Sequence, residues 1–184
     1  MNSTWSHRRI TVPLAAVALA TGAVSCGDDD RGARLSEDDA SVVCRGAVDL
    51  RFEPSINWRP KTINATGTGA LDGCGSKNGS HPTLKSARVT VTGSGTETSC
   101  TGIGAVSGTV DITWYDGDGR TGRTVGTTRV VIDDIGKVLT GHTTADSPVL
   151  PGRDVTAEGS PTSDVSSCPW GLDSGSAAGA IAFG

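Results

Sequence analysis

The sequence has little of what marks a metal site, an enzyme centre or a membrane helix. Of its 184 residues, three are histidine, one is methionine, one is tyrosine and two are phenylalanine. A membrane-spanning helix needs roughly 20 apolar residues, whereas the mostly apolar stretch from Ile10 to Val24 is only fifteen residues long and includes Pro13 and Gly22. Basic residues are outnumbered, 16 against 20 acidic residues, and this balance argues against a nucleic-acid partner.

The first forty residues have the order of an export signal followed by a tether. A polar stretch ending in His7-Arg8-Arg9 precedes the apolar residues 10–24, and small residues come before Cys26. Because a secretory signal peptide has this order, we expect residues 1–25 to be removed on export. Residues 27–40 hold six acidic and two basic residues, and Leu35 is their one large apolar side chain. We therefore expect residues 26–40 to form a flexible acidic tether.

Cys26 has two interpretations. Ala23 and Ser25 are small residues placed where an ordinary signal peptidase requires them, so that enzyme could cut before Cys26. Val24-Ser25-Cys26 also resembles the bacterial lipobox, whose cysteine takes a diacylglycerol group, although Ala23 stands where that motif usually has leucine. The chain has five cysteines, and acylation of Cys26 would leave four, enough for two disulfides. We expect an extracellular protein anchored to the cell membrane through Cys26, with free secretion as the alternative.

Residues 41–184 have the composition and periodicity of an all-β domain. Glycine is abundant, with 26 residues in the chain, and threonine and valine favour strands. Apolar and polar side chains alternate along 42–52 and 106–114, which is typical of antiparallel strands with one buried face. Further strands are predicted at 62–72, 84–93, 121–133, 137–145, 154–160 and 175–183. We expect a single domain, either an antiparallel β-sandwich or a small up-and-down barrel of about eight strands.

Three glycine-containing segments predict the turns between these strands. They are Asn78-Gly79, Asp116-Gly117-Asp118-Gly119, and Asp133-Asp134-Ile135-Gly136. If the strands form an up-and-down meander, Cys44 and Cys74 meet at one end of the sheet. Cys100 and Cys168 then meet at the opposite end. The meander thus favours the disulfides Cys44–Cys74 and Cys100–Cys168 over the two other pairings.

Neither the histidines nor the acidic turn predicts a metal site. His81 and His142 have no cysteine, histidine or acid near them at the spacing of metal ligands, and His81 precedes Pro82 in a predicted solvated turn. The segment Asp116-Gly117-Asp118-Gly119 resembles part of a calcium-binding loop. However, Thr127 stands where an EF-hand has its bidentate glutamate, and a hairpin turn explains the same residues. We expect no metal and no cofactor.

Two further motifs have simpler explanations than catalysis or phosphate binding. Asp173-Ser174-Gly175 resembles the active-site tripeptide of aspartic proteases, but that chemistry needs a second copy, which the chain lacks. We predict a loop there that leads into the last strand. The segments 67–73 and 102–108 share glycine spacing with phosphate loops, but a turn or a strand follows them instead of a helix. We therefore expect their glycines to make room for side chains packed across the sheet. No acid, base and nucleophile stand together, and we predict no enzymatic activity.

Three tryptophans remain after export. Trp114 ends an alternating strand on its apolar face, which predicts a core position. Trp58 and Trp170 lie between predicted strands and are candidates for exposed binding residues. Because the domain is poor in aromatic residues, the favoured interpretation is that both plug the core at an end of the sheet.

Several segments together resemble the uncharacterised secreted β-domains of high-GC actinobacteria. They are Cys44 with Phe52-Glu53-Pro54, the run Gly69 to Cys74, the run Val110 to Trp114, and Cys168 before the last strand. The resemblance implies export and an all-β fold, and it brings no activity.

Two functions follow from these expectations. The first is a non-enzymatic, lipid-anchored module of the cell surface that binds a protein, a glycan or an envelope component. The alternative is an extracellular carrier that holds a small apolar ligand inside a barrel. The inward positions combine valine, isoleucine and leucine with many glycines and alanines, so the interior either packs shut or leaves a cavity.

Overall fold

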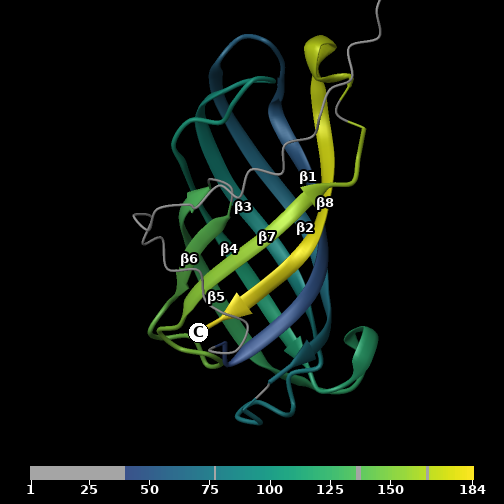
Figure 1. Cartoon of the computed structure of the whole chain (residues 1–184), viewed down its shortest axis with the longest axis vertical. Helices are drawn as coiled ribbons and strands as arrows, with labels where there is room; N and C mark the ends of the chain where they lie inside the picture. Colours follow the sequence, from purple (N-terminus) through teal and green to yellow (C-terminus); the bar gives the residue numbers. More distant parts are fainter. Residues whose placement is uncertain (1–39, 77, 136–137, 165) are drawn as a thin grey trace, which may run out of the picture. The chain divides into compact units, whose positions relative to one another are not determined.

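A computed structural model describes residues 40–76, 78–135, 138–164 and 166–184. In these residues, eight antiparallel strands follow one another around a single sheet, and the sheet closes because β1 also pairs with β8 (Figure 1). The strands are β1 (Val42–Ile56), β2 (Lys61–Gly75), β3 (Ser86–Thr98), β4 (Val106–Tyr115), β5 (Thr124–Ile135), β6 (Leu139–Thr143), β7 (Asp154–Pro161) and β8 (Leu172–Phe183). The all-β, antiparallel prediction is confirmed, and the architecture is an up-and-down barrel. Within the described residues, no helix is long and apolar enough to cross a membrane.

The predicted signal peptide, Cys26 and all but the last residue of the predicted tether lie outside the described residues. Ala40, which we assigned to the tether, is buried. The neighbouring Ser41 donates hydrogen bonds from its main-chain N–H and from its hydroxyl to the carbonyl oxygen of Phe183, at 2.7 and 2.8 Å. The packed domain therefore includes Ala40, and Ser41 lies beside the last residue of β8.

Period-two alternation places one set of side chains inside the barrel. In β1, Val42 and Cys44 are buried while Arg45 and Asp49 are exposed. In β4, Ile112 and Trp114 are buried while Asp111 is exposed. A barrel requires this pattern, because successive side chains of a strand point to opposite faces of the sheet.

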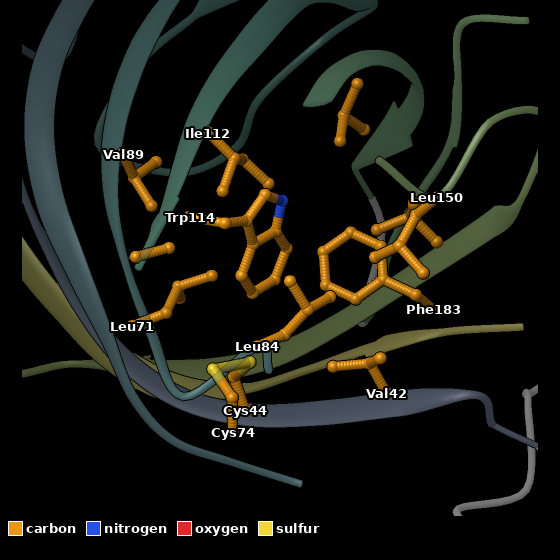
Figure 2. Close-up of a cluster of buried hydrophobic side chains, with 13 residues drawn as sticks. Val42, Cys44, Leu71, Cys74, Leu84, Val89, Ile112, Trp114, Leu150 and Phe183 are labelled. Carbon is orange, nitrogen blue, oxygen red and sulfur yellow. A yellow bond between two sulfur atoms is a disulfide. The ribbon is translucent and has the colours of Figure 1, made fainter. Parts of the chain in front are cut away.

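One end of the barrel is filled by a hydrophobic core, and we call it the plugged end (Figure 2). Trp114 and Phe183 are fully buried and meet edge to face, with ring centroids 5.6 Å apart. The indole N–H of Trp114 donates to the hydroxyl of Thr128 at 2.8 Å, so the buried ring has a polar partner. Leu84 and Leu150, from the loops at this end, complete the core. The predicted core position of Trp114 is confirmed.

Both predicted disulfides are present, at opposite ends of the barrel. Cys44 pairs with Cys74 in the plugged end, and Cys100 pairs with Cys168 between the loops at the other end, which we call the far end. The pairing follows from the strand order, because in a meander every second turn lies at the same end.

Two of the predicted turns are confirmed and one is wrong. Gly79 and Gly119 adopt φ of +69° and +62°, the left-handed region that glycine tolerates best. Asp116 closes the second turn by accepting a hydrogen bond from the main-chain N–H of Arg123 at 2.7 Å. The third turn was placed too early, because β5 continues to Ile135. An irregularity in the pairing with β6, between Ile132 and Asp134, lets Ile135 pair with Leu139.

Gly67 and Gly69 make room in the sheet, but the atoms nearest to them are main-chain atoms of β1 and not the side chains that we predicted. A β-carbon on Gly67 would collide with the carbonyl oxygen of Asp49, and one on Gly69 with that of Ala47. Glycine at these positions therefore lets β1 and β2 approach closely in a strongly curved wall.

A candidate ligand cavity inside the barrel

Beyond the hydrophobic core, the barrel contains a cavity of about 370 Å³. Its lining comes from all eight strands. The lining residues at inward positions are Gly46, Val48, Leu50, Leu71, Val89, Val91, Val110, Ile112, Ile135, Leu139, Ala157, Gly159, Ala177, Gly179 and Ile181. These residues are all apolar, so the site is an apolar chamber bounded by the sheet itself.

Solvent reaches this chamber. Val48, Leu50, Val91 and Val110 point inward but are only half-buried. Ile112 and Leu71 also line the cavity and belong to the core, where they are buried. The core thus closes the chamber at the plugged end, and we infer that the chamber communicates with solvent away from that end.

Among the described residues, the lining strands direct no charged side chain into the cavity. Glu158 borders the chamber, but it occupies an outward position of β7 between the inward Ala157 and Gly159. Its main-chain carbonyl oxygen lies next to Gly179. A charged ligand group would therefore lose its hydration here without gaining an ionic partner, which is unfavourable. The chamber suits an uncharged, apolar molecule.

Three large apolar side chains are exposed at the far end. Trp58 lies between β1 and β2, Ile103 between β3 and β4, and Trp170 between β7 and β8; their exposed fractions are 57%, 59% and 92%. The favoured prediction that Trp58 and Trp170 plug the core is therefore wrong. Leu84 and Leu150, from loops at the opposite end, complete the core instead.

The loops that carry these side chains are tied together. The main-chain N–H of Cys100 donates to the carbonyl oxygen of Asn57 at 3.0 Å, which joins the first loop to the second. The Cys100–Cys168 disulfide joins the second loop to the third. These links hold Trp58 and Trp170 at the same end of the barrel. Both remain candidates for exposed binding residues.

A second hollow, of about 720 Å³, is more polar. Its lining includes the charged residues Asp49 and Arg51. Most of the other lining residues bear a hydroxyl group: Thr66, Thr68, Thr90, Thr92, Ser163, Ser174 and Ser176. The hydroxyl of Ser176 donates to the Asp49 carboxylate at 2.5 Å. Leu50 and Val91 line both hollows, so the two are neighbours.

The other candidate residues lie apart from the cavity. Nδ1 of His142 is 2.9 Å from the Asp133 carboxylate on the outer face. His81 is half-buried rather than fully solvated, and burial, followed by the nearby charge of Arg153, lowers its pKa. Within the residues that the structure covers, no three potential metal ligands gather. Asp173, Ser174 and Gly175, which resemble the aspartic-protease tripeptide, belong to β8, so the prediction of a loop there is wrong. Asp173 is exposed.

The fold and the cavity define the class of architecture: a closed, eight-stranded, up-and-down antiparallel barrel with an apolar chamber. No protein-family model, curated protein or solved structure matches the chain. Its function is therefore argued from the site alone.

Proposed function

We propose that this domain is an extracellular carrier that holds a small, uncharged, apolar ligand inside the barrel. The observation that carries the proposal is the apolar cavity of about 370 Å³, bounded by inward residues of every strand. Ligand pockets of proteins typically measure about 300 to 1,000 Å³ and are mostly apolar. Eight-stranded barrels are wide enough to hold one small ligand. This function is the second of the two that the sequence suggests.

The cavity volume limits the size of the ligand. At a packing density of about 0.74, a cavity of about 370 Å³ accommodates about 270 Å³ of ligand van der Waals volume. A ligand of this size and polarity is sparingly soluble in water, so transport across an aqueous space requires a carrier.

The first prediction concerns the cavity wall. Ala177 faces the chamber, and replacing it with leucine adds three carbon atoms to that space. We expect Ala177→Leu to weaken binding of a neutral fluorescent probe, 1-N-phenylnaphthylamine, by about tenfold or more, because the ligand and the new side chain compete for one volume. The thermal midpoint of unfolding should stay equal or rise, because filling a cavity generally stabilises a protein.

The matched control is Ala70→Leu. Ala70 pairs with Ala47 and Arg88 on the outer face and does not line the chamber, so this variant should bind the probe like the wild type. The carrier proposal would fail if the wild type did not bind the probe. It would also fail if the two variants bound it equally well.

We also propose that Cys26 anchors this carrier to the cell membrane. Two disulfides in a domain of this size are typical of an oxidising compartment, which supports export. The anchor itself rests on the lipobox-like residues before Cys26. An anchor would keep the barrel close to a membrane, where apolar ligands concentrate.

The second prediction tests the anchor. The full chain, expressed in a bacterium that lipidates exported proteins, should partition with membranes, whereas Cys26→Ser should be found in the soluble fraction. Intact mass spectrometry of the mature wild type should show an N-terminal cysteine carrying diacylglycerol. An unmodified N-terminus, or equal partitioning of the two proteins, would leave free secretion as the explanation.

The exposed Trp58, Ile103 and Trp170 favour a second candidate function at the far end. Tryptophan is enriched at binding surfaces because it combines a large apolar area with a polar N–H group. Binding of a protein, glycan or envelope component through these loops is compatible with a filled barrel.

A further inference from the structure

The chamber has two unlike walls, and we propose that their difference selects a planar, uncharged ring system over a flexible acyl chain. This inference rests on the proposed carrier function and specifies the ligand class of the same cavity. Its basis is the shape and chemistry of the lining on opposite strands of the barrel.

The first wall is bare. Gly46 of β1 pairs with Gly179 of β8, which in turn pairs with Gly159 of β7, so three glycines lie in one row across three adjacent strands. All three line the cavity, and Gly159 and Gly179 are solvent-exposed even though their row faces inward. At Gly159 and Gly179 the wall is therefore a surface of main-chain atoms without side chains, whereas a methyl group of Leu71 lies over Gly46.

The packing of neighbouring atoms explains why this wall has no side chains. A β-carbon on Gly179 would collide with the carbonyl oxygen of Glu158, and one on Gly46 would lie 2.5 Å from a methyl carbon of Leu71. Side chains cannot be added at either position without displacing a neighbour. The space in front of Gly159 and Gly179 is consequently left to a ligand or to solvent.

The second wall carries branched side chains. Val89 of β3 pairs with Ile112 of β4, and Val91 pairs with Val110, which gives a block of four branched residues in two adjacent rows. In a closed barrel of eight consecutive strands, β3 and β4 lie across the lumen from β7 and β8. The chamber therefore places methyl groups opposite the glycine row.

A planar ring system fits between these walls. One face of the ring can lie on the glycine row, where no side chain holds it away from the main chain, while the other face contacts the methyl groups. A rigid ring also loses no internal rotational freedom on binding, unlike an acyl chain of equal carbon number. Because the part of the lining that the structure describes directs no charged side chain into the chamber, the ring system should carry no charge.

The test compares two uncharged ligands that have the same number of carbon atoms: pyrene, which is planar and rigid, and 1-hexadecanol, which is flexible. Both are delivered from cyclodextrin to the mature protein. Binding of pyrene is followed by its fluorescence, and binding of 1-hexadecanol by its competition with pyrene or with 1-N-phenylnaphthylamine. We expect pyrene to bind at least about tenfold more tightly.

The outcomes separate this inference from the carrier function on which it rests. Equal or tighter binding of 1-hexadecanol would overturn the planar-ligand inference and leave the carrier function standing. Failure of all three ligands to bind would overturn both. Preference for pyrene in the wild type supports the inference without any variant.

A substitution in the glycine row tests whether this row causes the preference for pyrene over 1-hexadecanol. In Gly159→Ala, the new β-carbon would lie 3.0 Å from the carbonyl oxygen of Ala178, a contact that a small shift relieves. This methyl group should weaken pyrene binding by about fivefold or more and change 1-hexadecanol binding by less than about twofold. The neighbouring Ser160→Ala, at an outward position, serves as the control. Equal weakening of both ligands by Gly159→Ala would contradict the assigned role of the row.

Discussion

Replacing Trp114 with alanine is expected to lower the free energy of unfolding by about 3 to 5 kcal/mol. The side chain is fully buried in the plugged end, where its ring meets Phe183 edge to face. Alanine would leave a large void and would also remove the N–H group that donates to the Thr128 hydroxyl. Urea unfolding, followed by far-ultraviolet circular dichroism, measures the change.

Trp170→Ala is the matched control, because it deletes the same side chain where 92% of the residue is exposed. Its free energy of unfolding should stay within about 0.5 kcal/mol of the wild-type value. If Trp170→Ala proved as costly as Trp114→Ala, the assignment of the core to the plugged end would be wrong.

The second large effect is expected from the far-end disulfide. Replacing Cys100 and Cys168 together with alanine should lower the free energy of unfolding by about 4 kcal/mol, because the bond joins residues 68 positions apart and restricts the unfolded chain. The same urea titration measures this change. A double variant avoids the reactive thiol that a single replacement would leave.

The Cys44→Ala, Cys74→Ala double variant provides a comparison at the plugged end. Its disulfide spans 30 residues, so chain entropy alone predicts a loss smaller by about 0.7 kcal/mol. Both cysteines are also buried in the core, and their removal costs packing in addition. An unchanged midpoint in either double variant would show that its bond restricts the unfolded chain very little.

The strands were predictable because alternation records burial directly. The inward Val42 and Cys44, and the inward Ile112 and Trp114, are separated by polar residues that face water, and only a strand produces that pattern. The disulfide pairing was predictable for the same reason, since strand order determines which loops share an end. The end of β5 was not predictable, because Asp133-Asp134 has the composition of a turn. The strand continues beyond these residues through an irregularity in its pairing with β6, and the sequence of β5 alone does not reveal that irregularity.

The cavity could be anticipated only as one of two possibilities. The sequence indicates that many glycines and alanines occupy inward positions, but whether facing side chains fill the space depends on the radius and curvature of the closed sheet. The exposure of Trp58 and Trp170 was missed for a related reason. Because the domain has few aromatic residues, we expected every tryptophan to be needed in the core. Instead, Leu84 and Leu150, which lie in loops, complete the core at the plugged end.

The hydrogen bonds between Ser41 and the carbonyl oxygen of Phe183 have a practical consequence for handling the protein. They show that β1 starts and β8 finishes at the same, plugged end. Immobilisation or fusion through either flank of the barrel would therefore attach the molecule by its closed base. The loops around Trp58 and Trp170 would stay free, so a sensor surface or a fusion partner should not obstruct them.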